Sequence, residues 1–378
     1  MSYRYSNAIV DPGLNTLLPP VPNVNYFPYL YSWGQNNFGQ LGLGNTTYYS
    51  SPNQVGSLTN WSIITTGFQF SLSIKNDGTI WSWGRGTKGQ LGLNNTTYYS
   101  SPKQIGALTN WAKVVCGRDY ALAIKTNGTL WAWGSNSYGQ LGLNNTSYNS
   151  SPVQVGALTT WLNITCGRYS SFATKTDGTL WAWGQNNYGQ LGTGNTNQQM
   201  SPVQIGSLTN WLNISAGLYS ALAIKTDGTL WSWGYNGYGQ LGLNNTTSYS
   251  SPKQVGALTT WKSISEGNNF TLSIKTNGTL WAWGFNGYGQ LGNNNLTYYS
   301  SPIQIGALTN WSSLFSSNSF SAATKNDGTL WVWGNNQYGQ LGLGNRTSYS
   351  SPKQIGSATT WLPFTKATES QFIVALQY

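Results

Sequence analysis

All 20 tryptophans of the 378-residue chain recur at a spacing of 50 residues, in three fixed columns. The first column consists of Trp33, Trp83, Trp133, Trp183, Trp233, Trp283 and Trp333. The second consists of Trp61, Trp111, Trp161, Trp211, Trp261, Trp311 and Trp361. The third consists of Trp81, Trp131, Trp181, Trp231, Trp281 and Trp331, with Tyr31 in the seventh place. Residues 29–378 are therefore seven copies of one unit, and such a repeat predicts units that bury their apolar faces against their neighbours.

Within each unit, the clearest local signal is a β-hairpin, as in residues 71–84. Residues 71–75 read Ser-Leu-Ser-Ile-Lys, and this alternation predicts a strand. Asp77-Gly78 then supplies the positive φ angles of a tight turn, and Trp81 and Trp83 lie on one side of the returning strand. The same turn is predicted at Asn127-Gly128, Asp177-Gly178, Asp227-Gly228, Asn277-Gly278 and Asp327-Gly328. The lysine before each turn, such as Lys75, is expected to be solvated.

Two further short strands are expected in each unit, around Gln54–Val55 and from Trp61 to Thr65. The proline at position 52, which recurs in all seven units, suits a strand start or an edge strand. No segment shows a helical period. Four strands in each of seven units predict an all-β fold, a seven-bladed β-propeller with four-stranded blades. A linear solenoid is the alternative.

The two ends of the repeat array favour a closed ring over a solenoid. The first unit begins at Tyr29, in the tryptophan-bearing strand of the hairpin, and the last ends at Tyr378, where that hairpin would turn. These ends are complementary halves of one hairpin. Residues 372–376 are therefore expected to pair with residues 29–33, whereas a solenoid would carry atypical capping units.

Charge is scarce and uneven in this sequence. Charged residues make up 7% of the chain, against about 25% in ordinary globular proteins, and the net charge is +10. Half of that net charge comes from residues 79–128, where six basic residues accompany the single acid Asp119. A basic patch can concentrate anions such as nucleic acid or acidic glycans, although solubility alone would also account for it. Nucleic acid is the less favoured partner.

The composition leaves little chemistry for catalysis. The chain has no histidine, and four of its eight carboxylates lie in the predicted hairpin turns. The other four, Asp11, Asp119, Glu266 and Glu369, are scattered, so no acid–base pair, nucleophile or metal site is predicted. We expect a protein that is not an enzyme and has no cofactor. Cys116 and Cys166 occupy one column of adjacent units and are expected to be buried thiols, too far apart for a disulfide.

Two columns vary most among the seven copies, and both are expected on one rim of the ring, where loops join strand ends. One column follows the Trp-Gly pair and includes Arg85, Tyr235 and Phe285. The other is the tripeptide after a repeated glycine, as at residues 118–120. Variation there indicates either a binding surface or neutral drift on a surface that binds nothing. The candidate binding residues are Arg85, Lys88, Lys113, Arg118, Asp119, Tyr120, Arg168, Tyr169, Tyr219, Tyr235 and Phe285.

Residues 1–28 precede the repeats and are expected to form an extended arm, because they contain five prolines. The arm is either a loose tail or an anchor to another subunit. Its apolar residues favour the anchor: Leu14, Leu17, Leu18, Val21, Val24, Tyr26 and Phe27. The segment has no apolar core of a signal peptide, and no stretch is long enough to span a membrane.

The motif string of each unit resembles that of the regulator of chromosome condensation repeat. The unit reads WxWGxNxYGQLG, then SPxQxG, NW, a glycine and IKxDGTLW, and GQLG is intact in all seven copies. The resemblance covers residues 29–378, is strongest to the bacterial and viral branch, and implies a seven-bladed propeller. It leaves function open, because this fold hosts nucleotide exchange, light sensing, enzyme inhibition and adhesion. The chain departs from the family in lacking all histidine and in carrying Ser317 and Ala367 at the repeated glycine.

Three functions are compatible with these features. The favoured one is a non-enzymatic component of a phage virion, attached to capsid or tail proteins through residues 1–28, with a rim that packs or adheres to a host-surface glycan or protein. The first alternative is a soluble or exported module, without a recognisable signal peptide, that plugs another protein's cleft with an aromatic rim. The second is a binder of anions, glycans or nucleic acid. The corresponding location is the virion, or otherwise the cytoplasm or the exterior.

Overall fold

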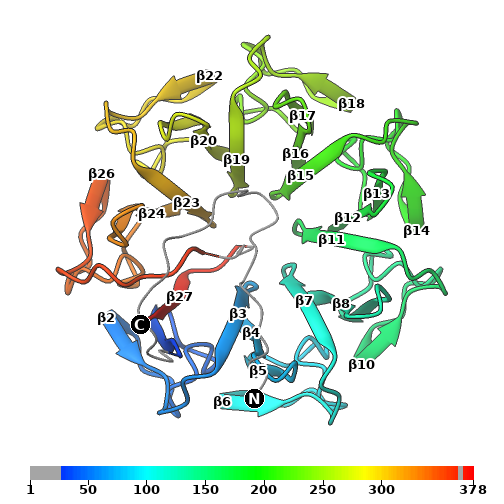
Figure 1. Cartoon of the computed structure of the whole chain (residues 1–378), viewed down its shortest axis with the longest axis vertical. Helices are drawn as coiled ribbons and strands as arrows, with labels where there is room; N and C mark the ends of the chain where they lie inside the picture. Colours follow the sequence, from blue (N-terminus) through cyan, green and yellow to red (C-terminus); the bar gives the residue numbers. More distant parts are fainter. Residues whose placement is uncertain (1–26, 365–368) are drawn as a thin grey trace, which may run out of the picture.

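The computed structural model describes residues 27–364 and 369–378 and arranges their strands as seven radial sheets around a central opening (Figure 1). Six sheets have four antiparallel strands in chain order. In each of these sheets, the first strand in chain order lies innermost, and the fourth lies at the outer edge (Figure 1). Within the described ranges the regular structure is entirely β, so the predicted all-β propeller is confirmed.

The six four-stranded blades share almost identical bounds, shifted by 50 residues. The first three are β3 (Trp61–Thr66), β4 (Phe70–Lys75), β5 (Ile80–Gly84) and β6 (Tyr99–Gln104); β7 (Trp111–Cys116), β8 (Tyr120–Lys125), β9 (Leu130–Gly134) and β10 (Asn149–Gln154); and β11 (Trp161–Cys166), β12 (Ser170–Lys175), β13 (Leu180–Gly184) and β14 (Gln199–Gln204). The next three are β15 (Trp211–Ala216), β16 (Ser220–Lys225), β17 (Leu230–Gly234) and β18 (Tyr249–Gln254); β19 (Trp261–Glu266), β20 (Phe270–Lys275), β21 (Leu280–Gly284) and β22 (Tyr299–Gln304); and β23 (Trp311–Ser316), β24 (Phe320–Lys325), β25 (Leu330–Gly334) and β26 (Tyr349–Gln354).

The seventh blade joins the two ends of the repeat array, as predicted. β1 (Tyr29–Gly34) pairs with β27 (Phe372–Gln377) over six residue pairs, from Tyr29 opposite Gln377 to Gly34 opposite Phe372. β2 (Tyr49–Gln54) pairs with the other side of β1, which gives the order β2-β1-β27. In the place of a fourth, innermost strand, the described residues form a single bridge between Trp361 and Gln377.

The outer strand of each blade begins earlier than the sequence pattern indicated. It was expected around Gln54–Val55, whereas β2 runs from Tyr49 to Gln54, with Pro52 inside it. The proline is tolerated because β2 lies at the outer edge of its sheet and pairs only with β1. Val55 follows the strand and turns into the core, where it is 3% exposed.

Tryptophans of the first column join each blade to the one before it. Trp83 is fully buried, and its indole Nε1 donates a hydrogen bond of 2.9 Å to the carbonyl of Gln40 in the preceding unit. The corresponding bond from Trp33 to Gln340, 3.0 Å long, crosses the closure of the ring. Gly42 belongs to the same contact, because a Cβ there would lie 2.9 Å from the Trp83 Nε1. The GQLG motif is thus the acceptor half of the blade interface.

The apolar core is divided into layers between adjacent blades. One layer combines Leu72, Ile74 and Ile80 of one blade with Trp111 and Trp133 of the next. Trp111 contacts both Trp131 and Trp133 edge-on, with ring centroids 5.9 and 6.2 Å apart. Each buried tryptophan removes about 150–250 Å² from water, an upper bound of roughly 4–6 kcal/mol before conformational entropy is counted. Packing between blades therefore holds the ring together.

The hairpin turn is a chain of side-chain contacts that ends on the third tryptophan column. The Asp77 Oδ1 accepts hydrogen bonds from the backbone N and the Oγ1 of Thr79, at 2.9 and 2.6 Å. The Thr79 Oγ1 in turn accepts a bond of 2.9 Å from the Trp81 Nε1. The amino group of Lys75 lies 3.8 Å from the centroid of the Trp81 ring. The motif KxDGTxW thus encodes one compact unit.

The expectation that the lysines before the turns are solvated was wrong. Lys75 is only 5% exposed, and its ammonium group packs against the faces of Trp81 and Trp61. The apolar stem and the cation–π contact together make this burial possible. Burial lowers the pKa of Lys75 below its usual value. The other lysines of the column are buried in the same way: Lys125, Lys175, Lys225, Lys275 and Lys325.

The turn aspartates predict a defined response to acid. Hydrogen bonds from Thr179 hold the pKa of Asp177 below its ordinary value of 3.8, and the corresponding threonines act likewise on Asp77, Asp227 and Asp327. A carboxyl with a depressed folded-state pKa stabilises the fold above its ordinary pKa, and this contribution is lost as the pH falls through the folded-state pKa. Replacing all four by asparagine should therefore flatten the fall in unfolding free energy below about pH 4.

Urea unfolding of the quadruple Asp→Asn variant and the wild type, across the acid range, checks this prediction. Asn127 and Asn277 already occupy the same turn position and accept the same bonds from Thr129 and Thr279, so the substitution preserves the turn. Equal slopes of unfolding free energy against pH in the two proteins would contradict it.

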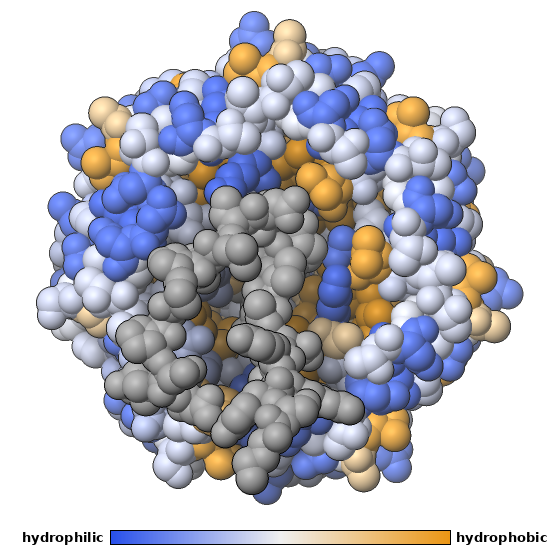
Figure 2. Space-filling model, viewed as in Figure 1, coloured by the Kyte–Doolittle hydropathy of each residue, from blue (hydrophilic) through white to orange (hydrophobic). Residues whose placement is uncertain are grey.

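The remaining sequence expectations concern the cysteines and the arm. Cys116 and Cys166 are buried and form no disulfide, as expected. The predicted arm lies almost wholly outside the described residues, including Leu14, Leu17, Leu18, Val21, Val24 and Tyr26. Phe27, the described member of that set, is 46% exposed. The face of the ring in Figure 2 shows apolar residues around the inner opening and mostly hydrophilic or intermediate residues toward the outside.

Candidate functional site

The two variable columns lie side by side on one face of the ring. The backbone N of Arg85 donates to the carbonyl of Gln69, at 2.9 Å, and Tyr235 donates in the same way to Tyr219. We call this surface the variable rim. It consists of residues 35, 85, 135, 185, 235, 285 and 335, together with residues 68–69, 118–119, 168–169, 218–219, 268–269, 318–319 and 369.

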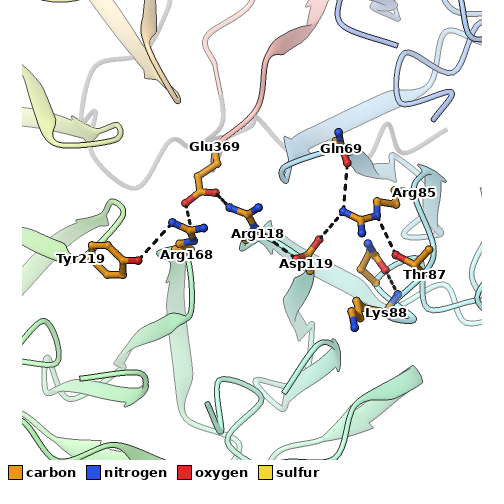
Figure 3. Close-up of polar contacts among 10 residues, drawn as sticks. Gln69, Arg85, Thr87, Lys88, Arg118, Asp119, Arg168, Tyr219 and Glu369 are labelled. Carbon is orange, nitrogen blue, oxygen red and sulfur yellow. Dashed lines mark hydrogen bonds and ion pairs between the residues drawn. The ribbon is translucent and has the colours of Figure 1, made fainter. Parts of the chain in front are cut away.

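A chain of ion pairs crosses the rim from blade to blade (Figure 3). The Asp119 carboxylate lies 3.8 Å from the Arg85 guanidinium and 3.6 Å from that of Arg118. Arg118 also bonds the Glu369 carboxylate at 2.7 Å, and Arg168 lies 3.4 Å from the other oxygen of Glu369. Side chains from three consecutive blades and from the closing segment thus form one ionic network.

Glu369 is the residue of this network that sequence reasoning missed. It was one of four scattered acids, 251 positions from its partner Arg118. A signal was available, because Glu369 occupies the same column as Gln69 and Asp119, and that column faces the rim in every unit. The side chain is 4% exposed, and its backbone has a φ of +54°. Burial raises the pKa of Glu369, and the guanidinium groups of Arg168 and Arg118 oppose that rise.

The ends of the network are fixed by neutral side chains. Arg85 donates from Nε to the Thr87 Oγ1 at 2.9 Å and from Nη1 to the Gln69 Oε1 at 3.3 Å. At the other end, the Arg168 Nη1 donates to the hydroxyl of Tyr219 at 3.4 Å. Lys88 lies beside Arg85 (Figure 3), and its backbone N donates to the Gln90 Oε1 at 2.7 Å.

Aromatic side chains continue the rim beyond Tyr219. The ring centroids of Tyr188 and Tyr219 are 4.9 Å apart, those of Tyr188 and Tyr235 are 5.1 Å apart, and those of Tyr238 and Phe285 are also 5.1 Å apart. We call this series the aromatic arc, and its members are Tyr138, Tyr169, Tyr188, Tyr219, Tyr235, Tyr238, Phe285, Tyr288 and Tyr298.

Four exposed members of the arc were not predicted. Tyr188, Tyr238, Tyr288 and Tyr298 are 37–49% exposed. The first three are the tyrosine of the YGQLG motif, which is the same in five of the seven units and therefore lies outside the two variable columns. Their exposure arises because the loop after the Trp-Gly pair carries that tyrosine out onto the rim, where it packs on rings of the variable columns.

Two of the predicted binding residues do not lie on the accessible rim. Tyr120 is fully buried, and its hydroxyl donates to the carbonyl of Ser170 at 2.7 Å. Its column is the first residue of the second strand, whose side chains face the blade interface. Lys113 lies near the start of β7, whereas Arg118 follows the end of that strand. The Lys113 Nζ donates a hydrogen bond of 2.7 Å to the Leu162 carbonyl. Lys113 therefore links two inner strands, and neither residue is available as a rim contact.

The two arginines of the basic patch predicted at residues 79–128 are paired with carboxylates of the rim. Arg85, Arg118 and Arg168 share the carboxylates of Asp119 and Glu369. A polyanion would have to displace these internal pairs to reach the guanidinium groups. The geometry thus favours a partner that is uncharged, or that carries charges of both signs, over nucleic acid.

No group of three His, Cys, Asp or Glu side chains that could hold a metal ion occurs in residues 27–364 and 369–378. In that same part of the chain, no helix is long and apolar enough to cross a membrane. Fold and site together define a seven-bladed β-propeller that presents a side-chain-variable rim.

Comparison with known proteins then identifies the family. The chain belongs to the RCC1-like domain family: the model of that domain matches residues 112–316, and the regulator of chromosome condensation (RCC1) repeat matches residues 29–74, 77–124 and 327–368. A comparison with curated protein sequences gave no significant match.

Solved structures share the fold at low sequence identity. Human WBSCR16 superposes with a TM-score of 0.82 at 22% identity, covering 93% of this chain and 98% of that one. Yeast RCC1 (Prp20), in a structure with Kap60, gives 0.83 at 20% identity, covering 93% and 88%. Prp20p from Saccharomyces cerevisiae, described with its binding to Gsp1p and histones, gives 0.83 at 19%, covering 94% and 92%. These similarities establish the fold of this chain.

Proposed function

We propose that this chain is a non-enzymatic binding propeller that holds a protein partner on the variable rim. The observation that carries the proposal is the concentration of exposed aromatic rings and paired charges on one rim of an otherwise repetitive ring. Tyrosine and arginine dominate the energetics of protein interfaces, because they combine large contact area with hydrogen bonding. Propellers of the same fold bind proteins, as yeast RCC1 binds Kap60.

We further propose that the propeller is displayed on a phage virion, with residues 1–28 as its attachment to capsid or tail proteins. The support for this assignment comes from the sequence. The surface is built of uncharged polar residues and tyrosine, the repeats are nearly perfect copies, and the arm is rich in proline and apolar residues. The alternative, a module that plugs the cleft of another protein, uses the same rim and differs in needing no arm.

The rim is tested by capture of host proteins on the immobilised full-length chain. We expect Tyr235→Ala and Phe285→Ala each to weaken the captured complex by at least about thirtyfold, because each removes an aromatic contact from the middle of the arc. Tyr148→Ala is the control, because Tyr148 is 61% exposed and lies outside the arc. Affinities are measured with the captured protein after purification. Unchanged affinity in both arc variants would contradict the proposal.

The arm is tested in the same protein. Removal of residues 1–28 should abolish incorporation into particles and leave rim binding intact, whereas the arc variants should show the reverse. Normal incorporation of the truncated chain would overturn the anchoring role of residues 1–28. Absence of the full-length chain from particles would overturn the virion assignment and favour the cleft-plugging module.

A further inference from the structure

The variable rim and its flanking loops contain sectors of different chemistry. The charged side chains lie together on the blades of β3–β6, β7–β10 and β11–β14 and in the closing segment. We call them the basic sector, which consists of Arg85, Lys88, Arg118, Asp119, Arg168 and Glu369. The aromatic arc begins at this sector, and a third sector carries uncharged polar side chains: Gln35, Asn268, Asn269, Asn318, Ser319 and Asn335. Among the described rim residues, charge is therefore confined to one sector.

The charges of the basic sector do not cancel. Four cations accompany two carboxylates, so the sector carries a net charge of +2. The burial of the two kinds of group is also unequal. The side chains of Asp119 and Glu369 are 15% and 3% exposed, whereas those of the three arginines are 22–25% exposed. The acids are thus covered while the cations reach the surface, and a partner meets a positive face.

Lys88 is the most accessible cation of the basic sector. Its side chain is exposed, and no described carboxylate lies within ion-pair distance of its ammonium group. Lys88 nevertheless acts on the same point as the three arginines. Burial raises the pKa of Asp119, and all four cations of the sector oppose that rise. The four positive charges therefore converge on one place, where an additional carboxylate would be attracted by all of them.

Aromatic rings flank the basic sector on both sides. On one side, the guanidinium carbon of Arg85 lies 5.5 Å from the centroid of the Phe38 ring. On the other side, the guanidinium carbon of Arg168 lies 5.3 Å from the ring centroid of Tyr169 and 5.9 Å from that of Tyr219, where the aromatic arc begins. A carboxylate held by the cations would thus have aromatic rings on either side, which favour apolar neighbours in the ligand.

From these observations, and resting on the proposed function of the rim as a protein-binding surface, we infer the chemistry of the partner. The partner presents one or two carboxylates, flanked by apolar side chains, to the basic sector. Guanidinium and ammonium groups recognise a carboxylate through charge-assisted hydrogen bonds. A net charge of +2 matches one or two acidic residues of a protein surface, whereas a polyanion would have to displace the internal ion pairs.

The experiment selects ligands from a displayed library of random short peptides on the immobilised full-length chain. A parallel selection uses the double variant Arg85→Gln with Lys88→Tyr. Another unit of the chain already carries this combination, as Gln185 and Tyr188, so the variant has a native precedent. We expect peptides selected on the wild type to be enriched in aspartate or glutamate beside apolar residues. Peptides selected on the double variant should lack that enrichment.

The affinities of the selected peptides give the second readout. An acidic peptide from the wild-type selection should bind the double variant about five- to tenfold more weakly at about 0.01 M salt. The difference should vanish at about 1 M salt, where the Debye length falls to about 3 Å. A control variant, Lys253→Val with Lys353→Val, removes the same two charges from the outer strands, where Val153 is the native precedent. Its affinity for the peptide should equal that of the wild type.

Three results would overturn the inference about the partner: no enrichment of acidic residues, equal enrichment on the double variant, or an equal loss of affinity in the outer-strand control. The last of these would show only an effect of net charge. The proposed function fails on a different result, namely selected peptides that bind Tyr235→Ala and Phe285→Ala as tightly as the wild type. A selection that yields no peptide would overturn both.

Discussion

Replacing Trp233 by alanine is expected to lower the free energy of unfolding by about 3–5 kcal/mol. The side chain is fully buried between two blades, and its Nε1 donates to the Gln190 carbonyl at 2.9 Å. The substitution opens a cavity in a layer that the flanking blades cannot close independently, because both are fixed in the ring. Equilibrium unfolding in urea gives the change, which approaches the whole stability of an ordinary domain.

A matched pair of conservative variants separates the hydrogen bond from the packing. Among the described contacts, the Gln190 carbonyl accepts only the Trp233 bond, because Ala221 stands where other units carry a hydroxyl. The Gln140 carbonyl accepts from both Trp183 and Ser171. Trp233→Phe should therefore cost about 1–3 kcal/mol more than Trp183→Phe, since it leaves a buried carbonyl without a donor. Equal costs would show that the indole N–H contributes nothing at this interface.

Deleting residues 372–378 is expected to abolish cooperative folding of the ring. β27 places Ile373 and Ala375 in one interblade layer and Phe372, Val374 and Leu376 in the next. Burying each of the four larger side chains contributes about 1.5–3 kcal/mol, a sum comparable with the total stability of a domain. The loss also leaves β1 as an unpaired edge of the ring. Circular dichroism and size exclusion should show a broad transition and self-association.

Two further measurements serve as controls for this prediction. Removing only Tyr378, which is 47% exposed, should leave the thermal transition unchanged. A synthetic peptide of residues 371–378, added to the truncated chain, should restore the transition by occupying the vacant place beside β1. A truncated chain that unfolds with the wild-type midpoint and slope would contradict the role of β27.

Much of the fold was predictable because its determinants are local or periodic. The Asp-Gly and Asn-Gly turns follow from backbone φ requirements, and the 50-residue tryptophan spacing requires identical packing at each blade. Tyr31 is an informative exception. It stands in the blade that has no hairpin turn before it, so there is neither a threonine to accept an indole bond nor a lysine to cover its face. It keeps the aromatic contact with Trp361, at 5.7 Å.

The candidate site was predictable only in part. The variable columns led to Arg85, Arg118, Asp119 and Arg168, and the structure joins these four in one ionic network. The burial of individual side chains was not predictable, because a lysine, a tyrosine or an aspartate is expected to be exposed until its neighbours in the fold are known. Lys75 and Tyr120 are both enclosed by residues of adjacent strands and blades.

Spacing along the chain is enough to predict the repeat, the hairpins, the closure by residues 372–376 and the family. The pairs of side chains that meet across the ring follow from the closed fold alone. Arg118 and Glu369 are 251 positions apart, yet they bond at 2.7 Å. That contact exists because the closed ring places residue 369, just before β27, beside the loops that carry Arg118 in the blade of β7–β10 and Arg168 in the blade of β11–β14, a proximity that no local pattern encodes.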